Sequence, residues 1–181
     1  MLKLRKNKKG FTLVELIVVI AIMAVLAGTV AGVTVSQLNK QTNNTAKSEA
    51  QTLASDLYNF MIDYKLSGAI STTTLKAAVD DFISENNQTG KIVAAELAAD
   101  GTVPSDNDEL KAAISGASFK AGEHQFYAVV YKTEVVVGKG EDNADIKEDR
   151  YKVRFCCLQK GSGSNQFPFA DYTYGDVLSD N

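Results

Sequence analysis

Glu15 is the residue of this 181-residue chain whose type and position point most directly to a chemical role. It lies four positions into an apolar run that starts at Phe11 and continues to about Val35, and no charged residue occurs between Leu16 and Asn39. A carboxylate costs roughly 2–3 kcal/mol or more in lipid, and intramembrane acids usually mark function. A secretory signal peptide or a simple anchor would gain nothing from Glu15. The position therefore indicates a functional role for Glu15.

The charge of the chain is divided unevenly at the start of this apolar run. Five of the 19 basic residues lie in residues 1–10, which contain no acid, so that this decapeptide carries +5 and the remainder carries −8. An apolar helix of about 20 residues can span the hydrocarbon core of a bilayer, and its positive flank is expected to stay in the cytoplasm. The acidic remainder gives no electrostatic support for binding nucleic acid.

Residues 8–15 read KKGFTLVE, a short motif that joins the basic decapeptide to the apolar run. It resembles the leader junction of type IV prepilins and their pseudopilin relatives. In that family a basic leader ends in glycine, the mature chain starts with phenylalanine, and a glutamate stands fifth in the mature chain. The resemblance is specific in sequence over residues 1 to about 40, and beyond them it concerns only the order of helices and strands. Within the family, the chain resembles the major pilins of Gram-positive clostridia.

The resemblance implies a processing pathway for the junction. A prepilin peptidase would cut between Gly10 and Phe11 on the cytoplasmic side of the membrane, and the new amine of Phe11 would be methylated. Glycine lets the backbone lie flat in a protease cleft, where a Cβ would crowd the scissile bond. The implied partners are the membrane before assembly, a pilus assembly ATPase with its inner-membrane platform, and further copies of the chain.

The cleavage implied by the resemblance would create a cationic partner for the Glu15 carboxylate. The ammonium that cleavage creates on Phe11 of a neighbouring subunit would attract the carboxylate by about 4 kcal/mol at about 4 Å and an effective dielectric constant near 20. That is comparable to the cost of burying the carboxylate. We therefore expect Glu15 to be neutralised only in the assembly and to register subunits against one another, without any catalytic role.

The implied function is structural. The chain would be a type IV pilus subunit, held in the cytoplasmic membrane and then polymerised into an extracellular filament for twitching motility, adhesion, aggregation or biofilm formation. The alternative within the class is a minor pilin or a pseudopilin of a type II secretion or DNA-uptake machine, although competence pseudopilins tend to be shorter than the 171 residues that follow Gly10. A membrane-anchored secreted enzyme is the alternative from another class.

Residues 11 to about 66 are predicted to form one helix, because no proline occurs before Pro104. The transmembrane or filament-core half comprises residues 11–38 and the amphipathic half residues 39–66, with Ser67 and Gly68 ending the helix. The face expected to pack on a sheet consists of Ala46, Ala50, Leu53, Leu57, Phe60 and Tyr64.

The middle of this helix contains a row of small residues at four-residue spacing, Ala24, Gly28 and Gly32. Such a row permits close helix contacts in lipid or in a filament core, but it is also common in membrane helices without that role. Residues 28–35 are rich in glycine and β-branched residues, which are poor helix formers in water. We therefore expect the helix to loosen there in the assembled fibre.

Residues 67–124 are predicted to form a helical connecting region. The first helix would run from Leu75 to Ile83 with Thr72–Thr74 as its cap, the second from Lys91 to Ala99, and the third from Ser105 or Asp106 to Gly116. Asp106–Glu109 superficially suggests calcium, but it lacks the glycine and the twelfth-position carboxylate of an EF-hand loop. Capping of the third helix is the favoured interpretation.

Residues 125–181 are predicted to form an antiparallel β-meander and a C-terminal segment, which gives an α+β fold of the type IV pilin kind. Phe126–Val137 is rich in β-branched and aromatic residues, and Arg150–Gln159 alternates apolar with charged residues, on either side of an acidic loop at Gly138–Asp149. Inward-facing residues would be Tyr127, Val129, Tyr131, Val135 and Val137 in the first strand and Tyr151, Val153, Phe155 and Cys157 in the second. Lys152 and Arg154 of the second strand would face outward. After a flexible link at residues 161–164, Phe167–Leu178 would supply a third strand around Tyr172 and Tyr174.

The cysteines and the histidine favour packing over chemistry. Cys156 and Cys157 are adjacent, so their side chains point to opposite faces of a strand, and neither has a further cysteine as a partner. With His124 as the single histidine and no G-x-S-x-G sequence, the chain offers no catalytic triad. We therefore expect no enzyme activity, no cofactor and no metal.

Overall fold

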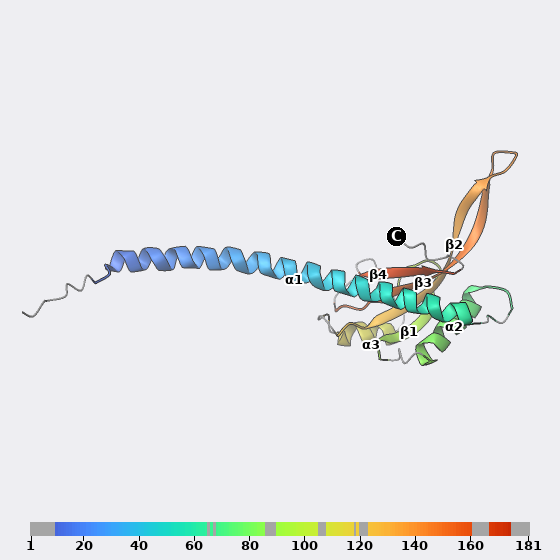
Figure 1. The fold of residues 1–181 in the computed structure, drawn as a ribbon, viewed down its shortest axis with the longest axis horizontal. Helices are drawn as coiled ribbons and strands as arrows, with labels where there is room; N and C mark the ends of the chain where they lie inside the picture. The colour runs from blue at the N-terminus through green and yellow to red at the C-terminus, as the bar shows by residue number, and fades with distance from the viewer. Residues whose placement is uncertain are drawn as a thin grey trace, which may run out of the picture. The chain divides into compact units, whose positions relative to one another are not determined.

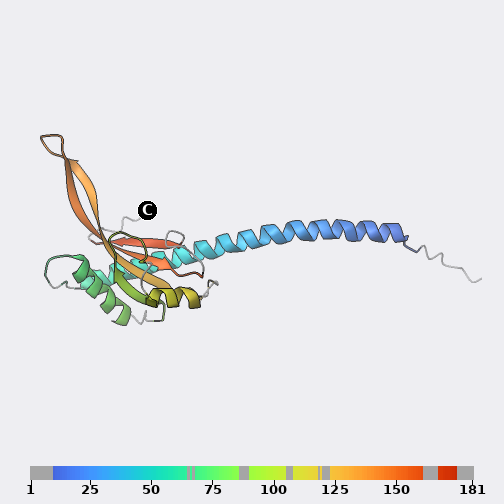
Figure 2. The same ribbon diagram turned by 180° about the vertical axis from the view of Figure 1, so that it is seen from behind.

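A computed structural model describes residues 10–64, 66, 68–85, 90–104, 108–117, 119, 123–160 and 167–174. The chain divides into two compact units, Met1–Gln41 and Thr42–Asn181. Figures 1 and 2 show the elements from opposite sides. They are, in chain order, α1 (Leu13–Asp63), α2 (Thr72–Glu85), β1 (Ile92–Leu97), α3 (Asp108–Gly116), β2 (Phe126–Lys139), β3 (Asp145–Cys157) and β4 (Phe169–Thr173).

The single long helix predicted from residues 11 to 66 is present as α1, with bounds within three residues of those predicted. Its second half packs by the predicted face, because Ala46, Ala50, Leu53 and Leu57 are all buried. Phe60 and Tyr64 are partly buried against the same core. The alternating three- and four-residue spacing of the apolar residues therefore located this face correctly.

The antiparallel meander predicted for residues 125–181 is present, and one further strand from the connecting region makes the sheet mixed. The strand order is β1-β2-β3-β4. β2 pairs antiparallel with β3, and β3 pairs antiparallel with β4, whereas β1 pairs parallel with β2. The long helix and the small mixed sheet give the predicted α+β arrangement, which is consistent with the pilin fold.

The helix predicted at Lys91–Ala99 is in fact strand β1, so the connecting region is not entirely helical. Alanine, leucine and glutamate in this segment favour a helix by local propensity. The segment instead hydrogen-bonds to β2, from Phe126 N to Lys91 O at 2.8 Å and from Ala98 N to Val130 O at 3.0 Å. Ile92 and Ala95 are buried. Tertiary pairing and burial thus override the local preference.

Helix α2 has the predicted apolar face, with Leu75, Val79, Phe82 and Ile83 buried. Its cap differs from the prediction, which assigned capping to Thr72–Thr74. Ser71 is the N-cap, since Thr74 N donates to Ser71 Oγ at 3.1 Å and Ser71 N donates to Thr74 Oγ1 at 2.9 Å. This reciprocal pair is a capping box in which threonine takes the usual place of glutamate.

The third helix lies near its predicted place. Helix α3 ends at Gly116 as expected, while the predicted start at Ser105 or Asp106 lies outside the described residues. The proposed link at residues 161–164 also lies outside them. The third strand is present as β4 and contains Tyr172.

The hairpin between β2 and β3 is longer than predicted. The acidic loop expected over Gly138–Asp149 is confined to residues 140–144, because β2 continues to Lys139 and β3 begins at Asp145. The turn is closed by a hydrogen bond from Gly140 N to Ala144 O at 2.8 Å. Asn143 adopts a positive φ of 62° there, which asparagine tolerates better than most residues.

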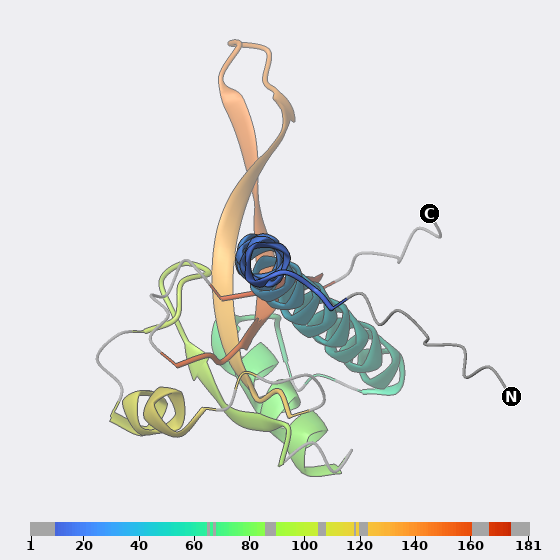
Figure 3. The same cartoon turned by 90° about the vertical axis from the view of Figure 1, so that its left-hand side faces the viewer.

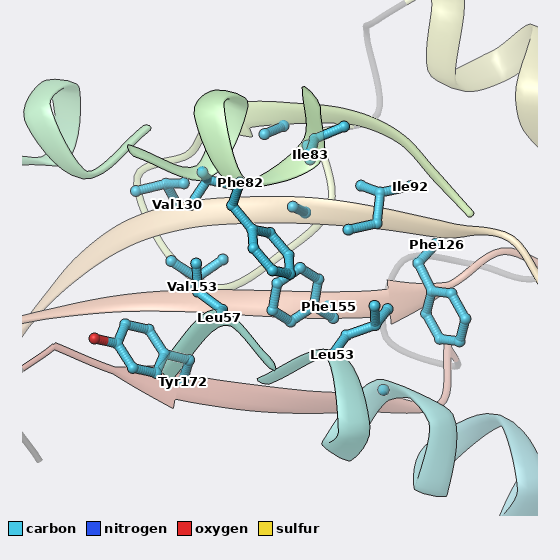
Figure 4. Packing of buried hydrophobic residues seen from close by; sticks show 14 of the residues in the cluster. Leu53, Leu57, Phe82, Ile83, Ile92, Phe126, Val130, Val153, Phe155 and Tyr172 are labelled. Carbon is cyan, nitrogen blue, oxygen red and sulfur yellow. The ribbon is translucent and has the colours of Figure 1, made fainter. Parts of the chain in front are cut away.

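Strand β2 is buried on both faces near its start, which explains why its sequence lacks a clear alternation of apolar and polar residues. The buried residues of the sheet belong to two clusters. Figure 4 shows the cluster in which residues from β2 and β3 contact Leu53 and Leu57 of α1 and Phe82 of α2. The opposite face of the sheet packs with α3. Tyr127, Val129 and Tyr131 share one face as predicted, but Val135 and Val137 are exposed.

Arg154 was expected to point outward into solvent, yet its side chain is only 22% exposed and joins three segments. Its Nε donates to Asp171 Oδ1 of β4 at 2.7 Å, and its Nη1 donates to Gly101 O at 3.0 Å. Its guanidinium also lies over the Phe169 ring, 4.0 Å from the centroid. The bond to Asp171 raises the pKa of Arg154 further above its usual range, so the guanidinium remains charged.

Candidate processing and assembly site

The Gly10–Phe11 peptide bond lies just before the first helix. Helix α1 begins at Leu13, and residues 10–12 have no regular secondary structure. Phe11 is 92% exposed. A peptidase must bind its substrate in an extended form, and this position meets that requirement without unwinding the helix.

Gly10 is not required by the fold of the chain itself. A Cβ placed on Gly10 would meet no atom within 4 Å, and the residue has no positive φ. Packing among the described residues therefore does not require glycine at this position. A crowded protease cleft, as the sequence predicts, would require it.

Glu15 is hydrogen-bonded within the subunit, and the expectation that its charge is neutralised only in an assembly stays a prediction. Its Oε2 accepts a hydrogen bond from Thr12 N at 2.8 Å and another from Thr12 Oγ1 at 2.8 Å. In return Glu15 N donates to Thr12 Oγ1 at 3.3 Å. Thr12 and Glu15 thus form a capping box at the first turn of α1. The pattern T-x-x-E, residues 12–15, is visible in the sequence and could have revealed this role.

The first half of α1 exposes its apolar side chains all round. Exposed fractions range from 47% at Val19 to 73% at Leu13, and none of the most apolar 18-residue window, of mean hydropathy 2.8, is buried. By length and composition this helix could cross a membrane. Hydroxyl groups in it are internally satisfied, since Thr29 Oγ1 donates to Leu26 O at 3.0 Å and Thr34 Oγ1 to Val30 O at 2.9 Å.

The small-residue row Ala24, Gly28 and Gly32 lies on this exposed helix. A Cβ on Gly28 would meet no atom within 4 Å, so glycine at this position is not needed for packing inside the chain. The surroundings of Gly32 are not among those described. Helix α1 is continuous through residues 28–35 in the subunit. The predicted loosening concerns the assembled fibre and stays a prediction.

Cys156 and Cys157 are unpaired, buried and on opposite faces of the sheet, as the sequence predicts. Cys157 belongs to the core beside α1 and α2, and Cys156 belongs to the core beside α3. Burial raises the pKa of each thiol to about 12. Among the residues that the structure describes, no cluster of three or more histidine, cysteine or acidic side chains could hold a metal ion.

His124 is a buried residue whose contact the sequence did not suggest. Its Nδ1 lies 3.2 Å from Glu49 Oε1 of α1, and its ring packs against Phe119. Its Nε2 has no hydrogen-bond partner within the described residues. The contact joins the segment just before β2 to α1 across a sequence separation of 75 residues. His124 therefore serves the packing of the Thr42–Asn181 unit.

The comparison with protein families identifies the N-terminal region. Residues 5–31 match the prokaryotic N-terminal methylation motif, and this range includes Gly10, Phe11 and Glu15. No curated protein and no solved structure matches the chain. The chain thus carries the methylation motif of a type IV pilin-like prepilin, followed by an exposed apolar helix and a pilin-like α+β fold.

Proposed function

We propose that this chain is the structural subunit of an extracellular type IV pilus. The prepilin peptidase cuts after Gly10, the amine of Phe11 is methylated, and the subunit remains anchored in the cytoplasmic membrane until assembly. An assembly ATPase and its membrane platform then move it into a filament that serves motility, adhesion, aggregation or biofilm formation. The observation that carries the proposal is the methylation motif at residues 5–31, which includes the start of an apolar helix whose most apolar window is not buried by any of the described residues.

The exposed helix explains how the subunit can be stable both in lipid and in a polymer. Each large aliphatic side chain is worth about 1.5–3 kcal/mol when it leaves water. The residues of the first half of α1 obtain this free energy only from lipid or from other apolar helices. Copies of the same helix offer the same apolar surface, so a filament core can replace the bilayer.

The charge of Glu15 favours the polymer over the lipid-embedded subunit. In the subunit its carboxylate is part of the capping box with Thr12, and these hydrogen bonds leave its negative charge in place. A methylated ammonium on Phe11 of a neighbouring copy would neutralise that charge. Only a copy in the correct register can do so, which is the registration role proposed for Glu15.

The intact mass of protein sheared from cells tests this function. We expect a species that starts at Phe11 and carries one methyl group. A species that starts near Gly28 would show an ordinary signal peptide and contradict the proposal. Methylated protein that stays in the membrane fraction, with none in the sheared fraction, would instead identify a pseudopilin or minor pilin.

A further inference from the structure

The outer part of the β2–β3 hairpin extends beyond the rest of the sheet. β1 pairs with β2 only as far as Val130, and β4 pairs with β3 only from Lys152 onward. Within the described residues, positions 132–139 and 145–150 therefore pair only with one another. We call residues 132–150 the ribbon, and Figure 3 shows it reaching away from the helices and strands of the Thr42–Asn181 unit.

The ribbon presents aliphatic side chains to solvent on both faces. Val135 is 40% exposed and Val136 is 52% exposed, on opposite faces of β2. Val137, at the bulge between Val136 and Gly138, is 51% exposed, and Ile146 on β3 is 50% exposed. A two-stranded hairpin is marginally stable in water, and its open edges can pair with another strand. These features indicate that the ribbon is more stable when it packs against another surface than when it is exposed to water.

The strands of the ribbon are electrically neutral, unlike the chain as a whole. They hold four basic and four acidic residues, all engaged in ion pairs: Lys132 with Asp149 at 3.1 Å, Lys139 with Asp145 at 3.6 Å, Lys147 with Glu134 at 3.0 Å and Arg150 with Glu148 at 3.2 Å. The acids Glu141 and Asp142 lie in the turn, outside the strands. The chain after Gly10 carries −8. The strands of the ribbon are therefore a neutral surface on an acidic molecule.

We propose that the ribbon docks on a second copy of this chain in the filament. Two copies that each carry −8 repel one another through acidic surfaces, whereas a neutral, partly apolar surface can be buried between them without that penalty. The same neutrality gives no attraction for a polyanion or a polycation. The proposal rests on the proposed function, because polymerisation supplies the high local concentration at which a modest contact is occupied.

Photo-crosslinking in the full-length chain tests the proposal. The photoreactive amino acid p-benzoylphenylalanine replaces Val136 in the ribbon or, as the control for polymerisation, Val25 in the apolar half of α1. Cells are irradiated, and sheared filaments are analysed by mass spectrometry. We expect adducts of two subunits from both positions, and the peptide joined to position 136 identifies the receiving surface.

The two positions separate failure of the docking from failure of the proposed function. Subunit adducts from position 25 without any from position 136 would overturn ribbon docking while leaving the polymer intact. Adducts from position 136 to a different protein would also overturn it. An absence of sheared filaments and of adducts from either position would contradict the polymer and the docking together.

A charge exchange gives an independent readout on the same surface. Lys147→Glu breaks the pair with Glu134 and makes the strands of the ribbon net negative, so we expect the yield of sheared filaments to fall about tenfold, because like charges facing across an interface are strongly unfavourable. The double variant Glu134→Lys with Lys147→Glu restores the pair and should restore the yield. An unchanged yield in Lys147→Glu alone would overturn the proposal.

Discussion

Glu15 combines two roles that different substitutions can separate. Its carboxylate caps the first turn of α1 together with Thr12, and its charge is proposed to bind the amine of a neighbouring Phe11. A capping box requires only an acceptor at this position, and glutamine can supply it. An ion pair requires the charge.

We predict that Glu15→Gln is cleaved and methylated normally but assembles poorly, because it keeps the cap and loses the charge. Glu15→Val, which loses both, should likewise be cleaved and fail to form filaments efficiently. The measurement is the intact mass of membrane-bound subunit together with the yield of sheared filaments. Leu16→Ile is the matched control in the same turn, and normal filaments from Glu15→Gln would refute the registration role.

The buried thiols give a prediction about pH. An unfolded cysteine has a pKa of about 8.5, whereas burial raises the pKa of Cys156 and Cys157 to about 12. Between these values the unfolded chain releases protons that the folded chain keeps. The free energy of unfolding is therefore unaffected by the thiols below about pH 8 and falls as the pH rises toward 12.

Thiol labelling with a colorimetric disulfide reagent at pH 8 checks this prediction. We expect slow reaction of both cysteines in the folded protein and fast, complete reaction in denaturant. The variant with Cys156→Ala and Cys157→Ala should lose part of the alkaline destabilisation seen in denaturation curves. Fast labelling of the folded protein would show that the strand end around these residues opens readily.

At the scale of elements, the second half of α1 is held by a small number of fully buried side chains. Leu57 is completely buried against the sheet, while Ile62 on the same helix is 65% exposed. Leu57→Ala should lower the free energy of unfolding by about 2–5 kcal/mol, since it removes methyl groups and leaves a cavity. Ile62→Ala is the matched control and should cost about 0.5 kcal/mol or less within the Thr42–Asn181 unit.

Thermal or denaturant unfolding of the mature chain in detergent measures this difference. The two variants delete comparable aliphatic groups from one helix, so their helix propensity changes in the same direction. Equal destabilisation by both would mean that the helix face is not defined by the core that Leu57 enters.

The faces of the helices could be predicted from the sequence, whereas strand β1 could not. The faces of α1 and α2 follow from helical periodicity, since one partner surface suffices to bury each stripe. β1 could not be recognised in this way, because its alanine-rich sequence becomes a strand only when β2 lies beside it. The half-buried position of Arg154 depends likewise on Asp171 and Gly101, which are distant in sequence.

At the scale of the whole molecule, the apolar half of α1 is expected to change on assembly. It is an unbroken helix in the subunit, yet residues 28–35 contain two glycines and five residues that are poor helix formers in water. We predict that this segment loosens in the filament and lets it stretch. A density map of the filament that shows continuous helix through residues 28–35 would refute this prediction.

A substitution that stabilises the helix at residues 28–35 tests the same expectation. Gly28→Ala adds a methyl group that meets no atom of the subunit and raises local helix stability by about 0.5–1 kcal/mol. We expect filaments of this variant to show more continuous density at residues 28–35 and to extend less under force. Loss of filaments would instead indicate that close helix packing at Gly28 requires glycine.

The sequence by itself determined the charge break at Gly10, the methylation motif, the apolar span and the position of Glu15, because each is a local property of consecutive residues. It also determined the T-x-x-E cap and the opposed cysteines, since both depend only on spacing along one element. The tertiary structure alone decided that residues 92–97 are a strand, that β2 is buried on two faces, and that the ribbon extends free of the sheet with every strand charge paired. These features arise from contacts between segments distant in the chain, whose free energy exceeds the local preferences that a sequence displays.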